Sequence, residues 1–183
     1  MIIGNYSDIA DSDRNISLSL LQADMRKNWH RCSSTADYGA DYISAPMPAR
    51  EKVRNSISMV LNELVENAVK YTPDQGESIE IRVIMEKNKV LFQVDNQIDE
   101  KSFKAFSRFA KVLVKDGKKL YLEALKKTAA AAGGKSAKSQ IGLLTILDFF
   151  HLSFGFQFEQ YKRRGRYRVS VQTVMPLTAG RGD

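Results

Sequence analysis

The segment from Ala49 to Tyr71 constrains the fold most, because its apolar residues recur at the spacing of one helix face. At 100° per residue these residues share one arc, which must face a hydrophobic core. Pro46 and Pro48 lie just before or at the expected start, where proline is common. The apolar positions are Val53, Ile57, Val60, Leu61, Leu64, Val65 and Ala68. The sequence therefore predicts a long helix over residues 49–71 with one buried face.

Two polar residues, Glu63 and Asn67, lie four residues apart at the border of that face. Residues at this spacing lie above one another on a helix, so both side chains point to the boundary where a cleft would lie. A carboxamide oxygen there can bind Mg²⁺, and a carboxylate one turn earlier can orient or deprotonate a nucleophile. The alternative is that Asn67 ends the helix before Pro73 and that Glu63 is a surface acid paired with Lys52 or Lys70.

The run from Leu61 to Pro73 resembles the N-box of the GHKL superfamily, whose members include gyrase, mismatch-repair ATPases, histidine kinases and anti-sigma-factor kinases. The resemblance implies an α+β fold, a two-layer α/β sandwich of the GHKL (Bergerat) ATP-binding type. Its sheet is mixed and mostly antiparallel, with helices on one face. ATP and Mg²⁺ are the implied cofactors, with Asn67 as the metal ligand and Glu63 as the general base.

The order of the other expected elements agrees with such a layered fold. Alternating apolar residues predict two hairpins, and two further helices lie between them. A sheet covered by helices on one face follows from this order. The expected elements are a hairpin of Ser78–Met85 and Val90–Asp95, helices over 101–132 and 140–150, and a hairpin of Leu152–Gln160 and Arg166–Met175.

The residues before the long helix show less regular patterns. Residues 16–29 have apolar positions at helical spacing and predict an amphipathic helix, whose apolar stripe would contact the core or a second copy in a homodimer. Residues 31–48 predict a loop with a short strand near Tyr42. The expected organisation is an extension over 1–48, a GHKL-like ATP-binding domain over 49–177 and a tail over 178–183.

Asp95 stands at the end of an expected strand, where the GHKL family has an Asp that accepts a hydrogen bond from the adenine amino group. The family's following glycines are replaced here by Gln97 and Asp99. The resemblance therefore implies a nucleotide contact for Asp95, and the neighbouring Asn96 and the N-box Lys70 are included in the same site. The alternative for Asp95 is a residue that caps a loop.

Gly142 is the glycine retained from the family's second glycine box. The resemblance implies that backbone amides near Gly142 hold phosphate oxygens at a helix start. The alternative is close packing, which is the more common reason for a single glycine at the start of a buried helix. Gly134-Lys135-Ser136 is not a P-loop, because the required earlier glycine is replaced by Ala129.

Among GHKL proteins, the chain is most similar to the SiaB-type and anti-sigma-factor-type stand-alone kinases. This similarity implies transfer of the γ-phosphoryl group of ATP to a Ser or Thr of a small partner-switching regulatory protein. A self-phosphorylating histidine kinase does not fit, because neither His30 nor His151 is followed directly by an acidic residue. A degenerate GHKL domain that sequesters a regulatory partner, with or without nucleotide, is the alternative that the replaced glycines favour.

Composition limits the remaining classes. The 183 residues suit one domain, and no apolar run approaches the roughly 20 residues that span a bilayer, so a membrane protein is not expected. The single Cys32 and the absence of a signal-peptide pattern favour the cytoplasm. The net charge of +7 leaves a basic nucleic-acid-binding protein as a second alternative. The basic segments lack the interleaved aromatic residues of a single-strand binding surface, which argues against it.

Overall fold

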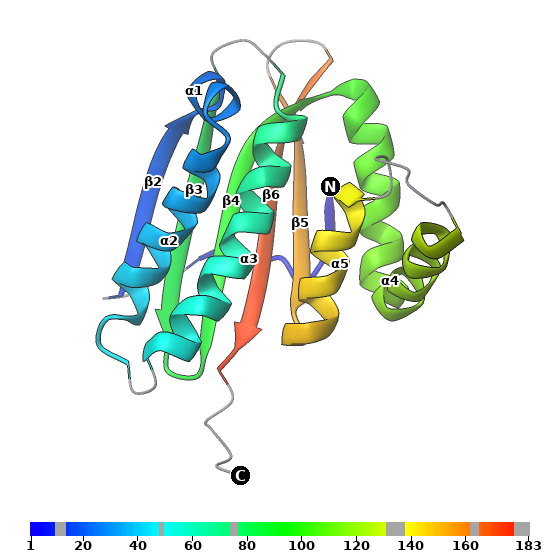
Figure 1. The fold of residues 1–183 in the computed structure, drawn as a ribbon. Helices are drawn as coiled ribbons and strands as arrows, with labels where there is room; N and C mark the ends of the chain where they lie inside the picture. Colours follow the sequence, from blue (N-terminus) through cyan, green and yellow to red (C-terminus); the bar gives the residue numbers. More distant parts are fainter. Residues whose placement is uncertain (10–13, 48–49, 74–76, 131–137, 162–164, 178–183) are drawn as a thin grey trace.

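The structure is a computed structural model. It describes residues 1–9, 14–47, 50–73, 77–130, 138–161 and 165–177. These residues form strands and helices that Figure 1 shows as a sheet with helices in front of it. The elements in chain order are β1 (Ile2–Gly4), β2 (Asn15–Leu21), α1 (Gln22–Lys27), α2 (His30–Ser44), α3 (Arg50–Tyr71), β3 (Ser78–Glu86), β4 (Lys89–Asp99), α4 (Glu100–Ala130), α5 (Lys138–Phe150), β5 (Ser153–Gln160) and β6 (Arg166–Pro176).

The sheet has six strands in the order β1-β5-β6-β4-β3-β2, and every pairing among them is antiparallel. The helices lie on one face of this sheet (Figure 1). The α+β class and the helices on one face are therefore confirmed. The expected mixed sheet is wrong, because every neighbouring pair among the described strands is antiparallel.

The predicted long helix is confirmed as α3, and the first predicted hairpin as β3 and β4. The apolar stripe of α3 is buried, and alternate residues of β3 are buried beneath the helices. Helix α3 packs against β3 and β4, so the polar residues at the border of its apolar stripe lie above this part of the sheet. The buried residues of the α3 stripe are Ile57, Val60, Leu61, Leu64, Val65, Ala68 and Val69.

The predicted helix over residues 16–29 is wrong. Residues 15–21 form the edge strand β2, and only residues 22–27 are helical, as α1. Ile16, Leu18 and Leu20 alternate with polar residues, and the sheet contact with β3 decides in favour of a strand. The two patterns overlap in this segment, because Leu20 and Met25 also suit a helical stripe.

The predicted loop over residues 31–48 is also wrong, since residues 30–44 form helix α2. Its buried positions include the small residues Ala36, Gly39 and Ala40. A Cβ atom on Gly39 would lie 2.9 Å from Cδ2 of Leu61, so α2 approaches α3 closely at this point. Small residues allow this contact but give no strong hydrophobic pattern in the sequence.

The C-terminal half agrees with the sequence pattern. Helix α4 covers the expected segment but has non-helical backbone at Asp116, where two helical parts meet. Helix α5 and the hairpin of β5 and β6 are confirmed. The expected end of the first helix at residues 131–132, part of the second hairpin turn and the tail at 178–183 lie outside the described residues.

The segment after β1 passes behind the sheet, on the face opposite the helices (Figure 1). The Gln172 side chain on β6 holds it: Oε1 accepts a hydrogen bond from the Ser7 amide at 3.0 Å, and Nε2 donates to the Ser7 carbonyl at 2.7 Å. A Cβ atom on Gly155 would lie 2.5 Å from the backbone of Asn5 and Tyr6. The chain therefore crosses the sheet in close contact, and glycine makes room for it.

Among the described helices, none combines the length and the apolar composition needed to cross a membrane.

Candidate functional site

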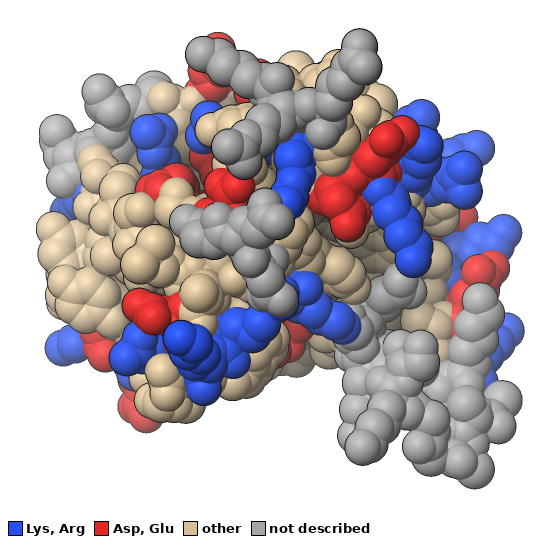
Figure 2. Space-filling view, turned by 90° about the horizontal axis from the view of Figure 1, so that it is seen from above, with Lys and Arg blue, Asp and Glu red and all other residues tan. Residues whose placement is uncertain are grey.

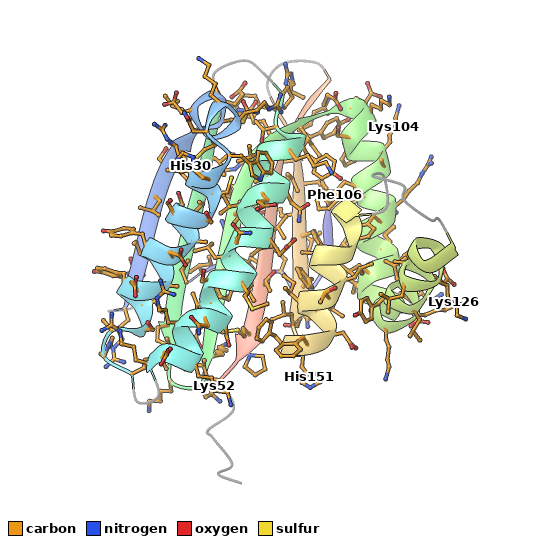
Figure 3. The ribbon with its side chains drawn as sticks, viewed as in Figure 1. His30, Lys52, Lys104, Phe106, Lys126 and His151 are labelled. Carbon is orange, nitrogen blue, oxygen red and sulfur yellow. The ribbon has the colours of Figure 1, made fainter. Side chains whose placement is uncertain are left out.

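A cleft of about 420 Å³ lies between α3, α4 and α5 and has β4 and β6 as its floor. Most of its lining is apolar, and a few polar side chains lie at its edges, which is the usual composition of a small-molecule site. Figure 3 labels Phe106, which lies in the space between α3 and α4 and lines the cleft. The polar or charged lining residues are Asn67, Tyr71, Asn96, Asp99, Lys101 and Ser102.

Asn67 enters the cleft from α3 with one end of its carboxamide fixed. Its Nδ2 atom donates a hydrogen bond to the backbone carbonyl of Glu63 at 2.7 Å. No donor in the described part of the chain bonds to its Oδ1 atom, so the oxygen is the end available to a ligand. The sequence-predicted pair therefore lies together on α3, and Asn67 presents the acceptor atom that a hard cation requires.

Glu63 lies next to the cleft, between α3 and α5, and is not part of the lining. A Cβ atom on Gly142 would collide with the Glu63 carboxylate, so Gly142 is a close-packing position for this side chain. Burial raises the pKa of Glu63, and repulsion from Glu66 raises it further. A carboxylate with a raised pKa is a stronger base, which suits proton transfer near neutral pH.

Asn96 on the cleft floor is held by a buried network whose hydrogen atoms can be assigned. Thr72 is 1% exposed, and its hydroxyl donates to the Ala68 carbonyl at 2.7 Å. Its only proton is used there, so Thr72 Oγ1 must accept the 2.9 Å hydrogen bond from Asn96 Nδ2. The Nδ2 atom also donates to the Gln97 carbonyl at 3.3 Å. The carboxamide orientation is thereby fixed, and Oδ1 remains as an acceptor in the cleft.

Side chains of helix α1 fix the end of α3 that carries this network. Gln22 Nε2 donates to the carbonyls of Val69 and Thr72, each at 3.2 Å. Arg26 donates to the same two carbonyls at 3.2 and 2.9 Å. The last carbonyls of a helix have no partner within it, so these bonds satisfy them and hold Thr72 in place.

Asp95 lies on the opposite face of the sheet from the cleft. Both carboxylate oxygens accept hydrogen bonds from Gln93 Nε2 at 3.0 Å, and one also accepts from Arg168 at 2.9 Å. Gln93 is in turn bonded to Gln172 at 2.9 Å, which holds the crossing segment. The structure thus brings Asn96 to the cleft and places Asp95 in a satisfied network on the other side.

The alternation of apolar residues along β4 could have predicted that Asn96, and not Asp95, faces the cleft. Phe92, Val94 and Ile98 are buried, and Val94 and Ile98 line the cleft with Asn96. Successive strand residues point to opposite faces, so a face that includes Val94 and Ile98 includes Asn96 and excludes Asp95.

The lysines outside the cleft are dispersed. Lys70 is exposed, and its Nζ atom lies 5.4 Å from the centre of the Tyr71 ring, outside the cleft lining. Lys52, Lys104 and Lys126 lie far apart in Figure 3. Figure 2 shows Lys and Arg side chains interspersed with Asp and Glu on the upper surface. This distribution differs from the continuous basic surface of a nucleic-acid-binding protein.

The two histidines take no part in the cleft. His30 begins α2, and His151 follows the end of α5 with a φ of 52° (Figure 3). Neither side chain lines the cleft.

The donor set fits Mg²⁺ that arrives with a phosphate ligand better than a metal held by protein alone. Within the described residues, no three His, Cys, Asp or Glu side chains gather to hold a metal. Asn67 Oδ1 supplies one hard oxygen. Mg²⁺ commonly takes one or two protein ligands and completes its shell with phosphate oxygens and water.

The half-buried carboxylate of Glu63 predicts a pH-dependent cost to the stability of the fold. Folding raises the pKa of Glu63, so at a pH below the unfolded-state pKa the carboxyl is neutral in both states and its burial costs no charge desolvation. The free-energy penalty of holding the charged carboxylate in the folded state grows as pH rises through the folded-state pKa. Glu63→Gln should therefore be more stable than wild type at pH 7, and the difference should vanish at low pH. Thermal unfolding measured from about pH 3.5, below the usual carboxyl pKa of about 4.3, up to about pH 8 tests this expectation. A variant less stable at every pH would contradict the assignment.

No protein-family profile matches the chain, and the search of curated proteins also found no match.

Proposed function

We propose that the cleft binds ATP with Mg²⁺ and that the protein is a GHKL-type kinase, which transfers the γ-phosphoryl group to a Ser or Thr of a small regulatory protein. One observation carries the proposal: Asn67 and Asn96 present free carboxamide oxygens to one apolar cleft, with the half-buried Glu63 one turn from Asn67. The resemblance of residues 61–73 to the N-box supports the same reading of these residues.

The apolar part of the cleft suits the flat ring of a purine. Val94, Phe106 and Leu143 supply apolar lining from three different elements. Asn96 Oδ1 supplies a fixed acceptor at the floor, and the 6-amino group of adenine is a donor that matches it. Guanine has an acceptor oxygen at that ring position, so it would place two acceptors together. Asn96 therefore takes the adenine-selecting role that the sequence suggested for Asp95.

The phosphate end lies with Asn67. Bound Mg²⁺ would neutralise charge on the phosphates. Asn67 is the residue that would hold the metal ion, through its Oδ1 atom. Lys101, at the α4 side of the cleft, adds a positive charge. In the transfer, the partner's hydroxyl oxygen forms a bond to the γ-phosphorus, and the bond from that phosphorus to the β–γ bridging oxygen breaks. Glu63 accepts the hydroxyl proton, and ADP leaves.

Asn96→Leu should weaken ATP binding by roughly 5–150-fold, because an unpaired amino group in a cleft costs about 1–3 kcal/mol. Leucine has a similar size and no acceptor. Isothermal titration with ATP and Mg²⁺ measures the change.

Purine riboside triphosphate, which lacks the 6-amino group, is the matched ligand. Wild type should bind it more weakly than ATP, whereas Asn96→Leu should bind the two equally. An equal preference for ATP in both proteins would show that Asn96 does not contact the amino group.

A second function is favoured by one specific feature, the filling of space at Gly142 by the Glu63 carboxylate. In this alternative, the cleft binds nucleotide without turnover, and nucleotide occupancy controls the capture of a regulatory partner. Both functions require Mg²⁺-dependent binding at Asn67. They differ in ADP formation, which only the kinase predicts.

A further inference from the structure

Strand β2 is an open edge of the sheet. It follows β3 at the end of the strand order, and no strand of the described residues pairs with its outer side. An open edge presents unpaired N–H and C=O groups to other chains, and proteins commonly protect such edges with charges, prolines or bulges. The sequence of β2, NISLSLL, contains no charge and no proline, and its register with β3 is uninterrupted.

The backbone groups that face outward can be assigned from the ends of the strand. The amide of Met85 donates to the Arg14 carbonyl at 2.9 Å, and the amide of Gln22 donates to the Glu77 carbonyl at 3.1 Å. Hydrogen-bonded pairs alternate along an antiparallel ladder, so the even-numbered residues of β2 bond to β3. Ser17 and Ser19 therefore direct their N–H and C=O groups toward the open side.

We propose that the chain forms a homodimer in which β2 pairs antiparallel with β2 of a second copy, in a register centred on Leu18. In this register Ser17 forms a hydrogen-bonded pair with Ser19 of the second copy. Leu18 lies opposite Leu18, and Ile16 lies opposite Leu20. At the centre of the strand, polar residues then meet on the open face and apolar residues meet on the helix-covered face, as a self-complementary two-fold interface requires. The sequence of β2 around Leu18 is symmetric, with a serine on each side of the leucine, so the strand can pair with the same strand of a second copy.

The surface beside the edge has the apolar area that such a dimer would cover. A groove of about 510 Å³ lies between β2 and the helices, and Leu18, Leu20 and Met25 line it. On α2, which lies in front of β2 in Figure 1, Tyr38 is 58% exposed and Tyr42 is 55% exposed. The two tyrosines are one helical turn apart, so they form one exposed aromatic stripe. This surface lies away from the cleft, and the dimer does not depend on the proposed kinase activity.

A single cysteine at the two-fold centre tests the register. In Leu18→Cys the two thiols would form a directly opposite, non-hydrogen-bonded pair with Cα atoms about 4.5 Å apart. This separation permits a disulfide. Mild oxidation should therefore give a covalent dimer on a non-reducing gel.

Leu20→Cys is the matched control, because position 20 would lie opposite Ile16 and far from its own copy. It should remain monomeric on the gel. The native Cys32 is fully buried, and burial raises its pKa to about 11, so wild type should also remain monomeric there. Equal cross-linking of Leu18→Cys and Leu20→Cys, or no cross-linking of either, would overturn the register.

Sedimentation equilibrium tests the dimer without a disulfide. Ser17→Lys/Ser19→Lys places like charges opposite each other across the two copies and should be monomeric. Ser17→Glu/Ser19→Lys places opposite charges there and should dimerise at least 10-fold more tightly than the double-lysine variant. The second variant also suits the β3 neighbours, since position 17 pairs with Arg82 and position 19 with Glu80. Circular dichroism confirms that both variants fold. A monomeric wild type, or equal dimerisation of both variants, would overturn the proposal.

Discussion

Asn67→Ala is expected to remove the Mg²⁺-dependent part of ATP binding and to weaken binding in Mg²⁺ by about 100-fold or more. The loss of even an outer-shell partner costs a metal site 10–100-fold, and Asn67 Oδ1 is assigned as a direct ligand. Alanine is also the residue that an α-helix tolerates best, so α3 should remain folded. Titration of the variant with ATP, with and without Mg²⁺, measures both quantities.

Asn62 provides the matched control for this variant. It is an asparagine on the same helix, its Nδ2 atom donates to Glu66 at 3.0 Å, and it does not line the cleft. Asn62→Ala should therefore bind ATP with Mg²⁺ as wild type does. Equal losses in Asn62→Ala and Asn67→Ala would indicate damage to α3, and would remove the support for a metal ligand.

Glu63→Gln is expected to lower the rate of γ-phosphoryl transfer by 10²–10⁴-fold, because it replaces the general base with an amide that cannot accept the proton. ATP affinity should change little, since Glu63 lies beside the cleft and not in its lining. Water can replace the partner's hydroxyl, so ADP formation from ATP provides the measurement.

The pH dependence of the same reaction separates catalysis from binding. The raised pKa of Glu63 means that the rate should increase as pH rises through that pKa, and the variant should lack this step. If wild type binds ATP but forms ADP no faster than Glu63→Gln, the kinase assignment fails and nucleotide-controlled capture of a partner is favoured.

The sequence predicted those elements whose pattern follows from burial on one side. Helix α3 and strand β3 each bury one periodic face, so their spacing is visible in the residues. Helix α2 was missed because Ala36, Gly39 and Ala40 form much of its buried surface, and small residues leave a weak hydrophobic signal. These small residues are required because α2 lies close to α3, and the sequence does not show that contact.

The sequence predicted the part of the candidate site that depends on local spacing within one element. Local spacing places Glu63 and Asn67 on one side of a helix, and the structure has them there. Asp95 and Asn96 are neighbours on a strand, so a shift of one residue exchanges the faces they occupy. The motif comparison favoured Asp95. The alternation of Val94 and Ile98 favours Asn96, and the hydrogen bond that Asn96 donates to Thr72, just after the end of α3, fixes its orientation.

The central claim is that the cleft is an ATP site completed by Mg²⁺, and calorimetric titration of the wild-type protein with ATP tests it most directly. We expect binding that is strong in Mg²⁺, weaker in its absence, and selective for ATP over GTP. Failure of the wild type to bind ATP in Mg²⁺, or equal binding of ATP and GTP, would contradict it.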